Sequence, residues 1–155
     1  PLKKVSKNIN KNMIKYKIKL IDKFYRTYFK KKPKMVITGL NPHCESIDSF
    51  NEDEKIIKPV IKSLIKSNYN IVGPVAADTI FLKKNRTNYN VIVGLYHDQV
   101  LTPIKTLFEY DAVNITLGLP FTRISPDHGP NEKMLGKNKS SPLSLIKALT
   151  FLDTN

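Results

Sequence analysis

Several side chains that could bind metals, protons or anions follow apolar runs of the kind that form strands. The runs and the residues after them are 35–38 with His43, 71–72 with Asp78, 91–95 with His97 and Asp98, and 112–117 with Arg123. Imidazole and carboxylate groups bind metals and move protons, whereas a guanidinium binds anions. Because the carboxyl ends of parallel strands meet at one edge of a sheet, we expect these side chains to form a ligand-binding crevice there.

The two histidines, His43 and His97, are candidates for a divalent metal site. A histidine in a loop is often only a hydrogen-bonding turn residue, but here both lie just beyond apolar strands. In addition, Asp98 could orient the imidazole of His97. A catalytic metal usually takes three protein ligands, so two histidines do not complete the site. The third ligand is then Asp78, Asp98, His128 or a residue outside this chain.

Lys105, Asn114 and Arg123 form a second group, spaced nine and nine residues apart. A lysine point charge beside a planar arginine fork is a common pairing for phosphate recognition. Lys105 lies in an otherwise apolar stretch, and Asn114 lies inside an apolar strand, where an amide needs partners. The alternative interpretation is a lysine with a buried stem, a structural asparagine and an ion-paired arginine.

The single cysteine, Cys44, excludes an internal disulfide framework and fits a reducing compartment. It has no CxxC partner and no obvious base, so we interpret it as a packed thiol rather than a metal ligand or nucleophile. The sequence has neither GxGxxG nor GxxxxGK[ST], and therefore neither a Rossmann fingerprint nor a Walker phosphate loop.

The elements that position these residues alternate along the chain. Apolar runs predict strands at 35–38, 71–72, 91–95 and 112–117. Helical spacing of apolar residues predicts a helix with the acids of residues 52–54 in its first turn and its stripe at residues 56–65, and a last helix over 142–152. This alternation predicts an α/β layered fold with a largely parallel sheet.

The charge of the chain is concentrated at one end. The 155 residues carry a net charge of +13, and residues 1–34 hold 13 of the 26 basic residues against one acid, Asp22. Residues 1–34 therefore predict a basic amphipathic helix, with Ser6 or Asn8 as its N-cap and a stripe from Ile14 to Tyr28. Residues 35–155 form the nearly neutral α/β portion.

Such a basic helix can bind nucleic acid, an anionic membrane or a calmodulin-like partner. We favour a solvated lysine face on a helix that packs against a core, because no Arg-rich or aromatic nucleic-acid motif accompanies the lysines. We therefore expect no nucleic-acid or membrane partner. No apolar run approaches the roughly 20 residues that span a bilayer, and no signal segment opens the sequence, so we expect a cytoplasmic protein.

Several longer motifs resemble the 4-hydroxythreonine-4-phosphate dehydrogenase family. They run in order along the chain: Gly39-Leu40-Asn41-Pro42-His43, Gly73-Pro74 with Ala77-Asp78-Thr79, Tyr96-His97-Asp98-Gln99, Val113 to Phe121 with Arg123, and Asp127-His128-Gly129. The resemblance implies an enzyme of vitamin B6 (pyridoxine and pyridoxal phosphate) biosynthesis. Its members use NAD or NADP and one divalent metal ion (Zn, Mg or Co) to oxidise the C3 hydroxyl of 4-phosphohydroxy-L-threonine. The product loses CO2 to give 3-amino-2-oxopropyl phosphate.

The same resemblance implies a layered α/β/α fold like that of isocitrate and isopropylmalate dehydrogenases, in a homodimer with a shared active site. By position, His43 and His97 match metal-binding histidines, His97 serving the partner's site. Lys105, Asn114 and Arg123 match substrate-binding residues. Asp78 and Asp98 match acids near the metal that support a ligand or transfer a proton.

Two features depart from the family pattern. Cys44-Glu45-Ser46-Ile47-Asp48 stands where the family usually has Ala-Gly-Glu and glycines, and the chain opens at Pro1, just after the position of the family's remaining metal histidine. We therefore expect an N-terminally truncated chain, without the upstream half, that is inactive alone. Two alternatives stay open: a dehydrogenase of a four-carbon sugar-acid phosphate (erythronate or threonate type), and a basic nucleic-acid- or lipid-binding module.

Overall fold

The computed structural model describes residues 1–45, 47, 50–129 and 132–153, which form two compact units. Unit 1 comprises residues 1–103, and unit 2 comprises residues 104–155. The boundary falls within one helix, α5 (His97–Phe108). Each unit contains both helices and strands, so the predicted α/β class is confirmed. None of the helices in the described ranges has the length and hydropathy needed to cross a bilayer.

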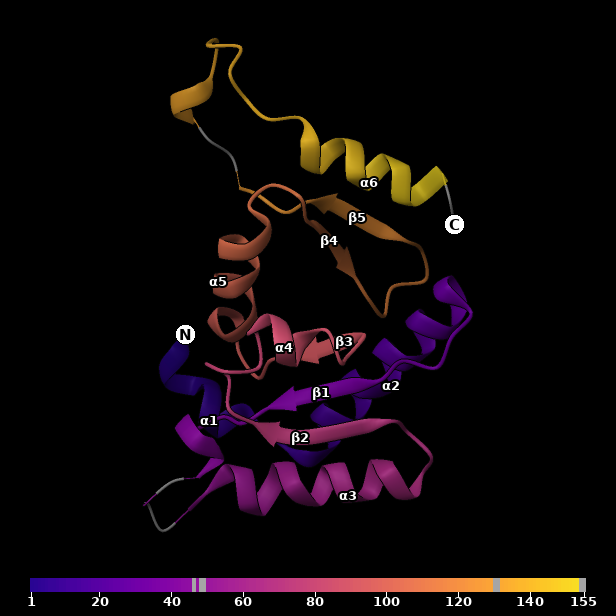
Figure 1. Ribbon diagram of the computed structural model, residues 1–155, viewed down its shortest axis with the longest axis vertical. Coiled ribbons are helices and arrows are strands. Elements are labelled where there is room, and N and C mark those ends of the chain that lie inside the picture. The colour runs from indigo at the N-terminus through magenta and orange to yellow at the C-terminus, as the bar shows by residue number, and fades with distance from the viewer. Residues whose placement is uncertain (46, 48–49, 130–131, 154–155) are drawn as a thin grey trace. The chain divides into compact units, whose positions relative to one another are not determined.

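Unit 1 is built on a three-stranded parallel sheet in the order β2-β1-β3 (Figure 1). The strands are β1 (Met35–Thr38), β2 (Ile71–Val75) and β3 (Val91–Val93). The helices are α1 (Val5–Asn8), α2 (Lys11–Phe29), α3 (Lys58–Lys66) and the short α4 (Lys83–Arg86). A π-helical turn, Asp53–Ile57, leads into α3. The central strand, β1, is buried throughout, as expected for a strand flanked on both edges.

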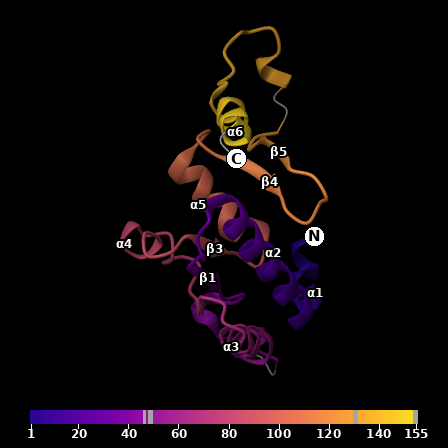
Figure 2. The same ribbon diagram turned by 90° about the vertical axis from the view of Figure 1, so that its right-hand side faces the viewer.

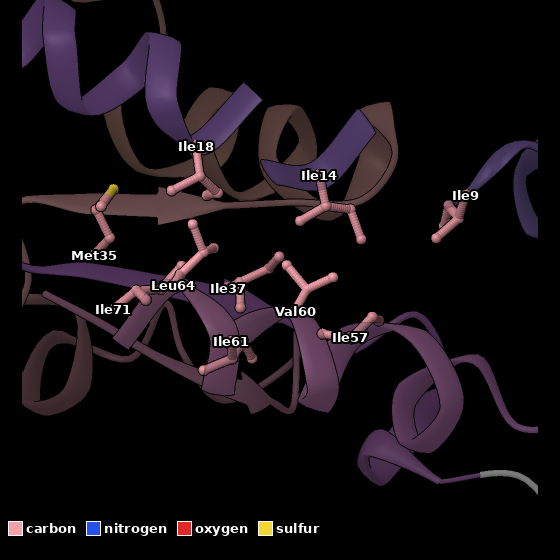
Figure 3. Packing of buried hydrophobic residues seen from close by; sticks show 10 residues of the cluster. All are labelled: Ile9, Ile14, Ile18, Met35, Ile37, Ile57, Val60, Ile61, Leu64 and Ile71. Carbon is pink, nitrogen blue, oxygen red and sulfur yellow. The ribbon is translucent and has the colours of Figure 1, made fainter. Parts of the chain in front are cut away.

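The core of unit 1 lies where α2 and α3 meet β1 and β2. Ile14 and Ile18 from α2 pack with residues of the other elements in one cluster (Figure 3). Its members are Ile9, Ile14, Ile18, Met35, Ile37, Ile57, Val60, Ile61, Leu64 and Ile71. The lysines of α2 lie mostly on its exposed side. Helix α2 therefore buries one face and exposes the other over Lys11–Phe29, and its geometry fits a solvated basic face.

The start of this helix differs from the prediction. Ser6 and Asn8 lie within the separate α1, and Asn10 is the N-cap of α2, where its Oδ1 accepts a hydrogen bond from the backbone N–H of Met13 at 2.9 Å. Asn10 has the extended backbone that an N-cap requires. The helix therefore begins after Asn10 and not after Ser6 or Asn8.

Strand β2 is longer than predicted because it continues through Gly73 and Pro74, which are joined by a cis peptide bond. The register against β1 shifts between Val36 and Thr38, so an irregularity lies opposite Ile37. Gly73 has φ +135°, and a Cβ placed on it would lie 2.4 Å from the carbonyl oxygen of Ile37. Only glycine fits this close approach of two backbones.

Unit 2 contains a two-stranded antiparallel sheet of β4 (Val113–Thr116) and β5 (Arg123–Pro126). The expectation that residues 112–117 join the parallel sheet is wrong: in the described part of the chain, β4 pairs with β5. The connection of residues 117–122 is too short for the crossover that parallel pairing needs. A 3-10 turn, Glu132–Met134, precedes the last helix.

That helix, α6 (Leu143–Asp153), confirms the prediction for 142–152 and packs alongside β4 and β5 (Figure 2). Its buried residues are the small Ser144 and Ala148. The Ser144 hydroxyl donates to the carbonyl of Ala112 and accepts from the backbone N–H of Asp127 at 2.9 Å. Ser144 therefore ties α6 to the segments on either side of the strand pair.

Candidate functional site

A pocket of about 200 Å³ lies at the carboxyl ends of the three parallel strands of unit 1. Its walls come from the segments that follow β1, β2 and β3. The lining residues are Leu40, Asn41, Pro42, His43, Ala77, Asp78, Tyr96 and Gln99. The expected gathering of polar side chains at this edge of the sheet is therefore observed for His43 and Asp78.

His43 lies in a single 3-10 turn, Pro42–Cys44, directly after β1. Its backbone has φ 59°, and that of Cys44 has φ 62°, so two consecutive residues other than glycine adopt the left-handed region. This conformation is uncommon for such residues and persists only where the surrounding contacts hold it. The imidazole of His43 is exposed at the pocket, where it can act as a ligand or a proton carrier.

Asp53 holds the start of this loop. It is fully buried, and its Oδ1 accepts a hydrogen bond from the backbone N–H of Leu40 at 2.8 Å. Its Oδ2 accepts from the backbone N–H and the side-chain amide of Asn41, each at 3.1 Å. In the sequence, Asp53 is one of three acids in the first turn of a predicted helix, and that pattern does not indicate this role.

Gln99 fixes the other side of the pocket. Its amide donates to the carbonyl of Gly39 at 2.7 Å, and its carbonyl oxygen accepts from the Thr38 hydroxyl and the Leu95 N–H, each at 2.8 Å. The side chain thereby joins the ends of β1 and β3. Gln99 belongs to the Tyr96-His97-Asp98-Gln99 motif, and this membership is the signal in the sequence that points to a role for its side chain.

His97 and Asp98 are the first residues of α5, and they contact each other: His97 Nδ1 lies 2.7 Å from Asp98 Oδ1. Both side chains are about 70% exposed or more, and neither lines the pocket that holds His43. Within the described ranges, no three His, Cys, Asp or Glu side chains are grouped so as to hold a metal ion. A third ligand from Asp78, Asp98 or His128 is therefore not assembled there.

The donor chemistry of the pocket nevertheless fits part of a divalent metal site. His43 offers an imidazole nitrogen and Asp78 a carboxylate, a set that suits zinc or cobalt. Cys44 is a poorer donor, because burial first, and then the charge of Asp53, raises the pKa of its thiol. Its Sγ also packs against Gly39, since a Cβ added to that glycine would lie only 2.8 Å from the sulfur. These contacts agree with a packed thiol. Ser46 and Asp48 of the same loop lie outside the described residues.

The second predicted group lies in unit 2. Lys105 Nζ lies 2.9 Å from Asp127 Oδ2, and Asp127 in turn is held through its backbone by Ser144. Arg123 pairs with Thr116 across the two strands and donates to its hydroxyl at 2.8 Å.

Asn114 lies two residues before Thr116 on β4 and opposite Ser125 on β5. Because side chains alternate along a strand, Asn114, Thr116 and Arg123 project from the same face of the pair. The structure therefore brings Asn114 and Arg123 together, with cationic and amide donors available to an anion.

Glu52 connects the pocket loop to the start of the chain. It accepts hydrogen bonds from the Ser6 hydroxyl and, at 3.2 Å, from the Asn41 side chain. The bond from Ser6 lowers the pKa of this carboxyl below its usual 4.5, and the backbone N–H of Glu52 and the Asn41 side chain add smaller effects of the same sign, although burial opposes the shift.

This carboxyl gives a testable pH dependence. A folded-state pKa below the unfolded value contributes stability above about pH 4.5, and that contribution is lost as the pH falls through the folded-state pKa. We expect Ser6→Ala to lower the free energy of unfolding by about 1 kcal/mol at pH 7. The difference from wild type should shrink towards pH 3 in urea unfolding. If Ser6→Ala lowers the free energy of unfolding equally at pH 7 and pH 3, the hydrogen bond from Ser6 does not lower the pKa of Glu52.

Comparison with known proteins gives consistent matches. The family model described as "Pyridoxal phosphate biosynthetic protein PdxA" matches residues 1–152. A 4-hydroxythreonine-4-phosphate dehydrogenase of Xanthobacter autotrophicus is 47% identical over 118 residues, which are 76% of this chain and 34% of the relative. The enzyme of the same name from a Sulfurihydrogenibium species is 42% identical over 151 residues, 96% of this chain and 46% of its own.

A solved structure shows the same fold. The crystal structure of the 4-hydroxythreonine-4-phosphate dehydrogenase from Klebsiella pneumoniae superposes with a TM-score of 0.78 at 31% identity, over 99% of this chain and 46% of that one. The chain thus spans about half the length, or less, of the relatives that it matches.

Proposed function

Because the chain belongs to the family of the pyridoxal phosphate biosynthetic protein PdxA, we propose that the protein at its full natural length is a 4-hydroxythreonine-4-phosphate dehydrogenase. The match of the family model to residues 1–152 carries this proposal, since it includes both the pocket of unit 1 and the strand pair of unit 2. The relatives that bear this name are dehydrogenases, and the substrate in that name is a phosphorylated small molecule.

In the proposed reaction, the C3 hydroxyl loses its proton and the same carbon transfers a hydride to NAD or NADP. The resulting β-keto acid then loses CO2 to give 3-amino-2-oxopropyl phosphate. A divalent metal (Zn, Mg or Co) would supply the positive charge that lowers the pKa of the hydroxyl. His43 is the pocket residue proposed to hold it, and Asp78 would hold or move a proton at its carboxylate.

Lys105, Asn114 and Arg123 are proposed to bind the substrate. The Asp127 carboxylate and Thr116 hydroxyl fix the cationic ends of Lys105 and Arg123, which lessens the side-chain freedom that substrate binding must remove. Fixed cationic groups also stabilise the negative charge that develops when CO2 leaves. The polar face shared by Asn114 and Arg123 supports this assignment.

We further propose a homodimer with the layered α/β/α fold of isocitrate and isopropylmalate dehydrogenases, in which His97 serves the site of the partner subunit. His97 and Asp98 are exposed and do not line the pocket with His43, which supports a role outside this pocket. Asp98 is then proposed to orient the imidazole of His97 through their 2.7 Å contact.

The function is tested with the protein at its full natural length. We expect formation of NADH or NADPH with 4-phosphohydroxy-L-threonine, abolished by a chelator and restored by zinc, magnesium or cobalt. Parallel assays use phosphoerythronate and phosphothreonate, because the motifs do not distinguish an amine from a hydroxyl at C2. Turnover of the sugar-acid phosphates alone would replace the proposed substrate. Absence of turnover on all three would contradict a dehydrogenase function.

A further inference from the structure

The loop that carries His43 adopts an uncommon backbone conformation, and one buried side chain, that of Asp53, accepts three of the hydrogen bonds at its start. His43 and Cys44 both have positive φ, at 59° and 62°, without being glycine. Such a backbone needs compensation from surrounding contacts. Before these two residues, Leu40 and Asn41 donate both backbone N–H groups to Asp53.

We propose that Asp53 is a positioning residue, which holds the Leu40–Cys44 loop in the conformation that places the imidazole of His43 at the pocket. This inference rests on the proposed function in so far as His43 binds the metal. Asp53 is 0% exposed and does not line the pocket, so it acts through Leu40 and Asn41 rather than on a ligand.

The geometry around Asp53 leaves little freedom for the loop. Both carboxylate oxygens are used, one by Leu40 and the other twice by Asn41. Asp53 itself is fixed, because its backbone N–H donates to the side chain of Asn51 at 3.0 Å. A Cβ on Gly39 would lie 2.9 Å from Asp53 Oδ1, so the carboxylate packs directly against the end of β1. The loop is therefore tied to the π-helical turn before α3.

The variant Asp53→Asn keeps the shape of the side chain but removes its charge, and it therefore separates this role from simple packing. An asparagine has the same shape, but one of its two terminal atoms is a donor and cannot accept from a backbone N–H. The anchor of either Leu40 or Asn41 is therefore lost. Val60→Ala is the matched control, since Val60 is also fully buried in the segment that follows, and its side chain belongs to the hydrophobic cluster (Figure 3).

Two measurements on the protein at its full natural length test the proposal. The first is hydrogen exchange of the peptide covering residues 39–45, relative to exchange in α3, without metal. The second is the dissociation constant for Co²⁺ by titration. We expect Asp53→Asn to speed exchange in the loop and to weaken Co²⁺ binding at least about tenfold. Val60→Ala should leave the relative exchange and Co²⁺ affinity unchanged.

Each outcome decides the matter. Unchanged exchange in Asp53→Asn overturns the proposal. If His43→Ala weakens Co²⁺ binding, faster exchange with wild-type Co²⁺ affinity in Asp53→Asn overturns it as well, because the loop would then not place the imidazole for the metal. An equal loss of Co²⁺ affinity in Val60→Ala would assign the effect to general destabilisation and also overturn it. His43→Ala serves as the reference for the proposed function. If that variant binds Co²⁺ as wild type does, the metal role of His43 is wrong, and the exchange data alone decide whether Asp53 holds the loop.

Discussion

Replacement of His43 by alanine is expected to abolish tight binding of a divalent metal and to lower kcat/KM by about a thousandfold or more. The imidazole is the one strong nitrogen donor among the residues that line the pocket, and the Asp78 carboxylate alone is a weak ligand for zinc or cobalt. Metal content of the purified protein and steady-state rates measure the two effects. Because the side chain is exposed, the change should leave the unfolding midpoint nearly unaltered.

A second experiment, on mixed dimers of two variants, tests whether His43 and His97 of different subunits share one site. If one site combines His43 of one subunit with His97 of the other, a mixed dimer of His43→Ala and His97→Ala subunits contains one intact site and one doubly altered site. Random mixing of the two inactive variants should then restore about a quarter of wild-type activity. Failure of the mixture to regain activity, when both variants bind each other, would contradict a shared site. Metal retention in His43→Ala would instead contradict the ligand assignment.

Replacement of Gly73 by alanine is expected to produce the largest loss of stability. The new Cβ would lie 2.4 Å from the carbonyl oxygen of Ile37 and 2.8 Å from its Cγ2, at a residue with φ +135°. Ile37 belongs to the fully buried central strand and cannot move without disturbing the core. Backbone strain alone contributes about 3 kcal/mol, and the clash adds to it. Urea unfolding followed by circular dichroism measures the loss.

Gly136 offers a matched control, because it also has a positive φ, +72°, but an added Cβ would meet nothing within 4 Å. Gly136→Ala should therefore cost only the left-handed strain, about 1 kcal/mol. A loss in Gly73→Ala no greater than that in Gly136→Ala would show that β2 can move away from Ile37. The close approach would then have no importance for stability.

The parallel strands and the main helices could be predicted because their signals are local. Met35, Val36 and Ile37 are apolar, as a strand covered on both faces requires, and the isoleucines of α2 recur with the helical period. The placement of His43 and Asp78 at one pocket followed from the rule that parallel strands share an edge. These inferences needed no knowledge of distant contacts.

The remaining features depend on contacts between residues far apart in the sequence. An acid such as Asp53 at a helix start already has an ordinary explanation in the helix dipole, so its bonds to Leu40 and Asn41 left no separate signal. The apolar pattern of β4 is the same whether its partner is parallel or antiparallel, and the unpredicted β5 decides which. The ion pair of Lys105 with Asp127 likewise joins a helix to a distant loop.

The pocket of unit 1 is lined by segments that begin where β1, β2 and β3 have already ended. We therefore expect substitutions at Pro42, Ala77 or Asp78 to leave the sheet pairing and the cluster around Ile18 and Ile37 intact, because none of these three residues belongs to either. Ligand preference in this architecture can drift through substitution in evolution while foldability is retained. Asp53 and Gln99 do not follow this rule, because each is buried and bonds to the backbone at the end of β1. A substitution at Asp53 or Gln99 would therefore change the stability of the fold and the shape of the pocket together.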